Sequence, residues 1–414
     1  MKFCMVTTFY PPYHFGGDAT YVHRLASELG RRGHSVDVVH DLDSYYLLHA
    51  GEPSLDYRPS DNVTVHRLKS PLGPISPLAT QQTGLPLFKP QLRRLLESGE
   101  HDVINFHNVS LIGPGAFSYG HAIKLYTIHE QWLVCPMHLL WKFGRRLCDS
   151  RSCFWCCLRG ARPPQLWRAT GLLRRRVRDI DQFLAPSRFV RDKHRELGME
   201  VPTTVLPHFL PDLAPVPPGD APPHPRPYFL FVGRLERIKG LHTLLEPFRL
   251  ARAADLLVAG EGGQEAALRA AAADMPNVRF LGAQPYERLR SLYRHAIALV
   301  VPSVCYEVFP MVILEAFAEA TPVIARDLAG AAEMVNDSGG GLLFRDEASL
   351  QSALERLRTN PGLRRELGER GRRTFLERWT SDVHVRNYLA IIEACREARL
   401  ASPGVRGDGP GGAA

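Results

Sequence analysis

Short apolar runs alternate with amphipathic segments along the first half of the chain. Residues 19–32 carry apolar side chains at the spacing of a helix and stop at Gly33. They lie between two apolar runs, which is the order of a βαβ unit. The runs that we interpret as buried strands span 2–7, 35–40, 63–67, 102–107, 124–129 and 181–186. This alternation predicts a parallel, doubly wound sheet.

The second half repeats the alternation after a proline-rich segment. Residues 207–227 contain nine prolines in 21 positions, a composition that excludes helix and central strand. Strands are then predicted over 228–232, 255–259, 278–281, 297–301 and 322–325, with helices from Gly240, from Gln264 and over 286–295 and 311–319. The predicted fold class is α/β, with two doubly wound parallel-sheet domains that face a central cleft.

These boundaries predict how the chain is divided. A first domain, 1–206, includes a cysteine-rich basic insertion at about 132–168, and a linker over 207–227 leads to a second domain, 228–400. We expect the last helix of the second domain to pack back on the first. The final segment, 401–414, is rich in Gly, Pro and Ala and is predicted to be disordered.

Composition supports two cores and no membrane span. The chain has 414 residues, of which 45% are hydrophobic and 23% charged, which is ordinary for globular domains. No run approaches the roughly 20 apolar residues that a spanning helix needs. The start of the chain lacks the basic and apolar regions of a secretory signal. We therefore expect a cytoplasmic protein.

The net charge of +8 is concentrated in the first half. Residues 1–200 hold 26 Lys and Arg against 18 Asp and Glu, whereas residues 201–414 hold 25 of each. Residues 135–195 alone carry 15 basic and 4 acidic side chains, and Trp132, Trp141, Trp155 and Trp167 lie in or beside them. This pattern suits an anionic membrane surface, met from the inner face, or a polyanionic acceptor. A solvated arginine-rich surface explains it equally well.

Two segments of the second half suit a diphosphate. Arg234 and Lys239 follow the strand 228–232, and such cations bind phosphate oxygens at the carboxyl end of a strand. Residues 302–316 follow another strand and open a helix near Met311, whose free N–H groups favour an anion. Pro310 fits the first turn of that helix.

The same segment carries two carboxylates, Glu307 and Glu315. If all eight steps between them were helical, the backbone would advance about 12 Å. Paired hydrolytic carboxylates lie only about 5 to 9.5 Å apart. We therefore interpret the two residues as separate hydroxyl contacts, one to a sugar and one to a ribose.

In these segments the chain resembles glycosyltransferase family 4. The resemblance rests on the Glu307-x7-Glu315 and Gly233-Arg234-x4-Lys239-Gly240 elements, and also covers Gly16-Gly17, Gly33-His34 and Gly260-Glu261-Gly262. It implies the GT-B fold, with two Rossmann-like domains, and a nucleotide diphosphate sugar as donor.

The resemblance also implies roles for individual residues. Arg234 and Lys239 would hold the diphosphate, Glu307 the donor sugar and Glu315 the ribose. The loop Val308, Phe309, Pro310 and Met311 would lie beneath the sugar and phosphate, and the nucleobase would lie near 261–263, with Gly262, and 280–282. The chain departs from the family at Val308 and Pro310, where most relatives have glycine, so the orientation of the sugar is open.

Candidate residues of the first domain follow its predicted strands. The family keeps a His followed by an acidic residue at the place of His129-Glu130, beside the donor sugar. This implies that His129 orients the sugar or its leaving phosphate, while Glu130 sets the tautomer of His129 or touches the acceptor. His107 and Asn108 are weaker candidates on the acceptor side. Gly16 and Gly17 permit close approach of donor or acceptor, or form a plain turn.

Five of the eight cysteines fall in the basic insertion, at Cys135, Cys148, Cys153, Cys156 and Cys157. In a reducing compartment such a cluster favours a structural zinc site, for which we select Cys135, Cys148, Cys153 and Cys156. The spacing of the last three also suits an iron–sulfur cluster, and buried free thiols are the remaining alternative. Two Asp-x-Asp pairs, Asp41 with Asp43 and Asp179 with Asp181, are interpreted as incidental.

Together these observations predict a retaining glycosyltransferase of the EC 2.4 class, whose catalysis needs no metal. It would move a sugar from a nucleotide diphosphate sugar to a hydroxyl of a glycan, a lipid-linked glycan or a small molecule. A phosphorylase or epimerase on the same fold lacks an identifiable site. A zinc-containing nucleic-acid-binding protein would leave Arg234, Lys239, Glu307 and Glu315 unexplained, so no nucleic-acid partner is expected. Donor sugar and acceptor stay open.

Overall fold

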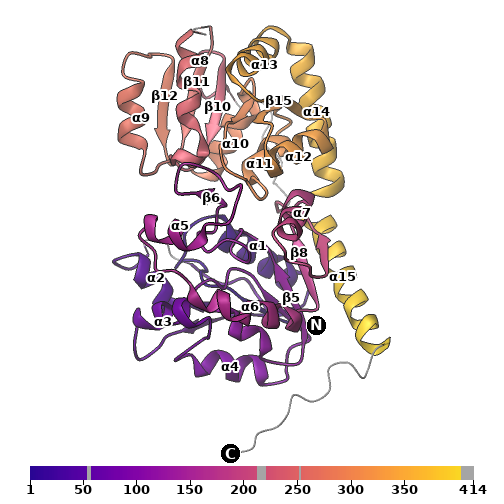
Figure 1. Ribbon diagram of the computed structural model, residues 1–414. Helices are drawn as coiled ribbons and strands as arrows, with labels where there is room; N and C mark the ends of the chain where they lie inside the picture. The colour runs from indigo at the N-terminus through magenta and orange to yellow at the C-terminus, as the bar shows by residue number, and fades with distance from the viewer. Residues whose placement is uncertain (54–56, 212–220, 251–252, 402–414) are drawn as a thin grey trace, which may run out of the picture.

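The computed structural model describes residues 1–53, 57–211, 221–250 and 253–401. Within them the chain forms two α/β units, the lower and upper halves of Figure 1. The tail that we predicted to be disordered lies outside the described residues, except for Ala401. None of the helices in this described part combines the length and apolarity that a bilayer crossing needs.

The lower unit is built on a seven-stranded parallel sheet in the order β3-β2-β1-β4-β5-β8-β9. Alternate residues of β1 enter different cores, Phe3 and Met5 on one face and Cys4 and Val6 on the other, because successive side chains of a strand point to opposite faces. The strands are β1 Lys2–Val6, β2 Ser35–Asp41, β3 Val63–Leu68, β4 Val103–Phe106, β5 Ile123–Thr127, β8 Gln182–Ala185 and β9 Thr203–Val205. The helices are α1 Gly17–Arg31, α2 Leu42–Leu48, α3 Ile75–Thr83, α4 Pro90–Glu97, α5 Cys153–Arg159, α6 Leu172–Arg176 and α7 Arg188–Glu196.

The upper unit has a six-stranded parallel sheet in the order β12-β11-β10-β13-β14-β15. Its strands are β10 Tyr228–Val232, β11 Asp255–Ala259, β12 Val278–Gly282, β13 Leu299–Val301, β14 Val323–Arg326 and β15 Gly341–Phe344. Its helices are α8 Leu245–Leu250, α9 Glu265–Ala271, α10 Tyr286–His295, α11 Met311–Ala318, α12 Ala329–Ser338, α13 Glu347–Thr359, α14 Pro361–Arg378 and α15 Ser381–Ala401. The strand order reverses between β1 and β4 and between β10 and β13, and ligands of doubly wound sheets bind at such points.

One predicted helix was wrong in detail. One short 3-10 turn, Arg237–Lys239, precedes Gly240 and a second, Leu241–Thr243, follows it, and the α-helix begins only at Leu245. Gly240 has a positive φ of 75°, and a Cβ at this position would overlap the carbonyl of Pro302. The glycine therefore lets the turn after β10 pack on the turn after β13, which an uninterrupted helix from Gly240 would prevent.

The basic insertion forms little regular structure. A two-stranded antiparallel hairpin, β6 Trp141–Lys142 and β7 Arg146–Leu147, precedes the short helix α5. Figure 1 draws this hairpin on the side of the lower unit that faces the upper one.

Among the contacts that join the units, two sets lie at α15 and at α7. Helix α15 leaves the upper unit and runs along the lower one (Figure 1), where the Asn105 side chain donates to Tyr388 Oη at 3.0 Å. At the other contact, the guanidinium of Arg188 at the start of α7 pairs with Asp337 of α12 at 2.6 Å. The carboxylate of Glu333 accepts the backbone N–H groups of Arg188 and Phe189, both at 2.8 Å.

The buried contact of α15 leads to a stability prediction. Tyr388→Phe removes the only hydroxyl that accepts from the Asn105 amide nitrogen in the described structure, so the variant should lose about 1 to 3 kcal/mol of unfolding free energy. Urea unfolding measures the loss. Tyr46→Phe is the matched control, because its hydroxyl donates to Glu52 at the surface; an equal loss in both variants would contradict a specific anchoring contact.

Candidate active site

A charged pair links the loops that follow β10 and β13. Lys239 Nζ lies 2.6 Å from Glu307 Oε1, and Ser303 Oγ donates to the same oxygen at 2.7 Å. The side chains are 25% and 13% exposed, so the pair is largely removed from water without being sealed. An ammonium and a carboxylate are thus held together at the carboxyl edge of the upper sheet.

The pair keeps both groups charged. Burial by itself would raise the pKa of Glu307, but Lys239, Ser303 and the charge of Arg234 hold it below its usual range. Burial likewise opposes the charge of Lys239, and Glu307 nevertheless raises the pKa of that ammonium. Arg234 itself is exposed, and no hydrogen bond or ion pair joins it to any residue that the structure describes. A second cation beside the pair is therefore open to a ligand.

Close backbone packing shapes this edge. The turn after β11 lies on the turn after β10, because Leu235 N–H donates to the Glu261 carbonyl at 2.8 Å. A Cβ at Gly262 would lie 2.7 Å from Leu235 N, so glycine is required there for packing alone. The predicted nucleotide contact of Gly262 stays a prediction.

The loop before α11 contacts the lower unit. The Val308 carbonyl accepts a hydrogen bond from Ser187 Oγ at 2.9 Å, and the Phe309 ring packs on His208 and Trp379. Pro310 immediately precedes Met311, the first residue of α11. The Val308 side chain also packs against the core of the lower unit, so this loop contacts the neighbouring domain.

Glu315 lies on α11 in an environment different from that of Glu307. Tyr293 Oη donates to Glu315 Oε2 at 2.8 Å, while burial raises the pKa of the carboxyl group. The two carboxylates therefore have separate partners, and their predicted sugar and ribose contacts stay predictions.

His129 follows β5 in the lower unit, and its closest polar neighbour is another histidine. His129 Nε2 lies 3.0 Å from His107 Nδ1, and the two rings are stacked with centroids 5.2 Å apart. The Tyr21 ring lies 4.9 Å away on the edge. Glu130 does not hydrogen-bond His129, because it accepts from His138 Nδ1 at 2.6 Å; its alternative role, a contact with the acceptor, stays a prediction.

His208 was missed because it lies in the proline-rich segment. It is 6% exposed, stacks on His129 with centroids 5.1 Å apart and contacts Phe309 at 5.6 Å. The neighbouring Phe209 and Leu210 are fully buried. The run of large apolar and aromatic residues between Pro207 and Pro211 was the signal for an anchored segment. This histidine thus connects the predicted site of the lower unit to the loop before α11.

The structure shows the surroundings of the Gly16-Gly17 pair and of the two Asp-x-Asp pairs. Gly16 precedes α1 at a φ of 90°, and a Cβ there would meet nothing within 4 Å, so the loop has room for a ligand. The same holds for the space at Gly17. Asp41 is buried and paired with Lys89 at 2.6 Å, and Asp181 binds Arg399, so these carboxylates already have structural partners.

The predicted zinc site is not supported. Across the residues that the structure describes, no group of three or more His, Cys, Asp or Glu side chains is arranged to hold a metal ion. All eight cysteines are free thiols. The thiol of Cys148 donates to the Ser150 carbonyl, and Cys156 Sγ accepts from the Phe143 N–H at 3.4 Å. His138, near the cluster, is engaged by Glu130.

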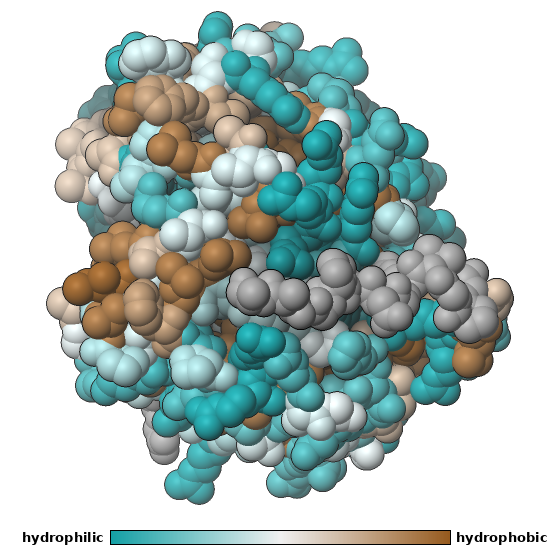
Figure 2. Space-filling view, turned by 60° about the horizontal axis from the view of Figure 1, so that its bottom comes forward, coloured by the Kyte–Doolittle hydropathy of each residue, from teal (hydrophilic) through white to brown (hydrophobic). Residues whose placement is uncertain are grey.

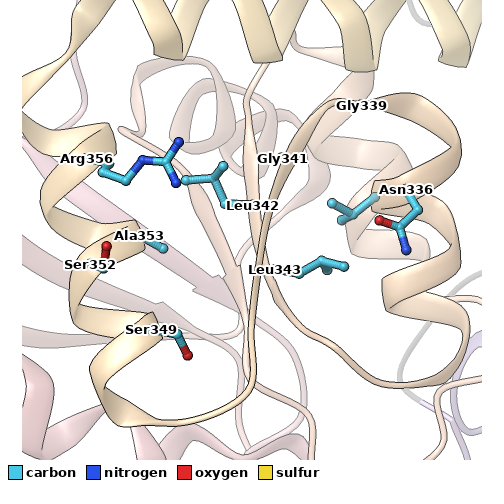
Figure 3. Close-up of a pocket in the computed structure, with 10 residues that line it drawn as sticks. Asn336, Gly339, Gly341, Leu342, Leu343, Ser349, Ser352, Ala353 and Arg356 are labelled. Atoms are coloured by element: carbon cyan, nitrogen blue, oxygen red, sulfur yellow. The ribbon is translucent and has the colours of Figure 1, made fainter.

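A separate pocket lies on the outer edge of the upper sheet. Figure 3 shows it between α12, β15 and α13, with Asn336, Leu342 and Arg356 among its lining side chains. None of the predicted site residues lines it, and the edge strand β15 is far in sheet order from the switch point between β10 and β13. We therefore do not assign the site to this pocket.

Comparisons with known proteins identify the family of this chain. The family model for glycosyltransferase family 4 matches residues 15–211, and that for glycosyl transferases group 1 matches 218–374. The glycogen synthase of Mycobacterium tuberculosis is 28% identical over 428 residues, which cover 97% of this chain and 95% of that protein. A D-inositol 3-phosphate glycosyltransferase of Frankia alni is 38% identical over 156 residues, 33% of this chain and 38% of that protein.

Solved structures share the fold. Sucrose-phosphate synthase from Thermosynechococcus elongatus superposes with a TM-score of 0.71 at 21% identity, over 97% of this chain and 100% of that one. HepE of Anabaena, in complex with UDP and glucose, gives a TM-score of 0.68 at 17% identity, over 95% and 100%. The predicted fold and family are confirmed: the chain is a GT-B protein and belongs to the family 4 glycosyltransferases, which transfer a sugar from a nucleotide sugar.

Proposed function

We propose that the donor site of this glycosyltransferase consists of Arg234, Lys239, Glu307, Glu315 and His129, and that it binds a nucleoside diphosphate sugar. The observation that carries the proposal is the Lys239–Glu307 pair at 2.6 Å, beside the unpaired Arg234 and in front of α11. HepE, which shares the fold, binds UDP and glucose.

Charge determines what this arrangement can do. When the glycosidic bond to the diphosphate breaks, negative charge develops on the leaving phosphate. Arg234, Lys239 and the amino end of α11 stabilise that charge without having to reorganise. Glu307, held by Ser303, accepts hydrogen bonds from hydroxyls of the donor sugar, and Glu315 accepts hydrogen bonds from those of the ribose.

Transfer then proceeds with retention from the front face. The chain supplies no second carboxylate beside Glu307 within the described site, because Glu315 is engaged separately by Tyr293. The leaving phosphate itself takes the proton of the acceptor hydroxyl, and the new bond forms on the same face. The acceptor is a glycan, a lipid-linked glycan or a small molecule.

The donor site predicts activity directly. With UDP-, GDP- and ADP-sugars as a panel, one nucleotide class should raise Tm and be slowly hydrolysed; ligand at 100 times its Kd adds about 2.7 kcal/mol of stability. Lys239→Ala and Glu307→Ala should each lower kcat/KM by about 100-fold or more, since each removes a charge aimed at the reacting groups. Glu246→Ala, an exposed carboxylate paired with Arg249, is the control. Retained turnover in either site variant would remove the assignment.

The charged pair also predicts a pH dependence of stability. Lys239→Met leaves Glu307 without its cation and should cost roughly 1 to 3 kcal/mol at pH 7, less than for a fully buried pair because both side chains are partly exposed. Lys239 holds the pKa of Glu307 below its usual value, so this contribution is present above about pH 4.3, the unfolded pKa, and is lost as pH falls through the folded one. Urea unfolding from pH 8 to pH 3 should show the difference from wild type shrinking in acid. A difference that does not change with pH would show that Lys239 acts by packing.

We further propose that the basic insertion contacts an anionic membrane. Helix α5 exposes Phe154, Trp155 and Leu158 at 49%, 66% and 48%, and Arg146 of the preceding hairpin is 65% exposed. Figure 2 shows apolar side chains gathered on the left of its face, the side on which Figure 1 places α2, α3 and α5. Exposed aromatic residues flanked by arginines favour a headgroup region.

Co-sedimentation with vesicles tests the contact. The protein should bind phosphatidylcholine vesicles that contain phosphatidylserine and should be released by salt, because basic residues contribute about 1 kcal/mol each near such a surface. Trp155→Ala with Arg146→Ala should weaken binding by about tenfold or more. Leu376→Ala on α14 of the other unit, 52% exposed, is the matched control. Equal binding by all three proteins would contradict the proposal.

A further inference from the structure

The two ring nitrogens of His129 face different surroundings. Nε2 lies 3.0 Å from His107 Nδ1, inside the protein. Nδ1 has no hydrogen-bond partner among the described residues and is not completely buried. Nδ1 is therefore the nitrogen that a ligand can reach.

His107 has a defined tautomer because of its second contact. It is fully buried, and its Nε2 lies 3.3 Å from Met5 Sδ. A thioether sulfur accepts hydrogen bonds and cannot donate. The contact is therefore favourable when His107 Nε2 carries the proton. Burial keeps the pKa of His107 well below its usual range, so the ring holds only that one proton and its Nδ1 is a bare acceptor.

The tautomer passes from one ring to the next. Since His107 Nδ1 accepts, His129 Nε2 must donate across the 3.0 Å contact. Burial lowers the pKa of His129 to about 4, so the ring is neutral near pH 7. The Tyr21 and His208 rings pack against it at 4.9 and 5.1 Å and hold its orientation. Its remaining nitrogen, Nδ1, then carries a lone pair and no proton.

We propose that Met5 and His107 are positioning residues that fix the tautomer of His129, so that His129 presents a hydrogen-bond acceptor to the donor sugar. The part that concerns the sugar rests on the proposed function. An acceptor at this place selects a neutral sugar with a hydroxyl facing Nδ1. It disfavours a carboxylate or phosphate there, because those oxygens also only accept. It also means that His129 orients the sugar, and does not donate to the leaving phosphate.

Nitrogen-15 NMR of the ligand-free protein, labelled at histidine, tests the tautomer without any activity. The His129 signals are those that disappear in His129→Gln. At pH 7.5 the proton should be on Nε2, with Nδ1 unprotonated. A proton on Nδ1 would overturn the proposal.

Met5→Leu tests the origin of the preference, because this swap conserves volume but removes the sulfur acceptor. A second His129 tautomer should then become populated, and kcat/KM for the donor should fall by about 3- to 10-fold, the loss of one weak hydrogen bond. Met334→Leu makes the same change at a buried methionine of the other unit and should alter neither. An unchanged tautomer in Met5→Leu would contradict the role of the sulfur.

Donor analogues test the sugar contact. In a series of nucleotide sugars, each sugar hydroxyl in turn is replaced by hydrogen or by fluorine. At one carbon, both replacements should lower kcat/KM by about 10- to 100-fold, because neither hydrogen nor fluorine can donate a hydrogen bond to Nδ1. His129→Ala should be insensitive at that carbon. A fluoro analogue that keeps activity there would mean that His129 donates, and would overturn the proposal. If no nucleotide sugar is turned over at all, the proposed function fails while the NMR result stands separately.

Discussion

The site depends on keeping an ammonium and a carboxylate together at the edge of an apolar domain. Lys239 and Glu307 leave most of their water, which costs free energy, and their mutual attraction with the hydroxyl of Ser303 compensates for it. Gly240 lets the two loops that carry the pair approach, because a Cβ there would overlap the Pro302 carbonyl. Charges held in this way are preorganised, which is what the proposed stabilisation of a leaving phosphate requires.

The second requirement is that both sheets present their carboxyl edges to the same space. Parallel strands place all their following loops at one edge, so two such sheets build one site when those edges meet. Here the two edges are in contact through the rings of Phe309, His208 and His129. A hydrogen bond from Ser187 Oγ to the Val308 carbonyl adds to this contact. The bulk at Val308 and Phe309 therefore has a structural role: it seats the loop before α11 against the lower unit. It also brings His129 within two ring contacts of the loop that carries Glu307.

Much of the fold followed from local pattern. Buried parallel strands are continuous apolar runs, so β1, β5, β10 and β11 could be located to within about two residues. The loops after them carried the charged and glycine residues that the family resemblance picks out. The sequence pattern gave a wrong helix start after Gly240, because glycine conformation and loop packing decide the local structure there. It also suggested a metal site, from cysteine spacing, that the structure does not support. Spacing along the chain does not say whether sulfur atoms converge, and two of these thiols, Cys148 and Cys156, hydrogen-bond to backbone groups instead.

The amino-acid sequence by itself determined the class of fold and, through its resemblance, the family, and it singled out Arg234, Lys239, Glu307 and Glu315 as candidate site residues, because periodicity and short motifs are local properties of the chain. Only the tertiary structure decided that Glu307 is paired with Lys239 and that Glu130 accepts a hydrogen bond from His138. It also decided that His107 contacts both His129 and Met5. Met5, His107 and His129 lie on three different strands or the loops after them. Their contact arises from the order of strands in the sheet, which side-chain periodicity does not encode.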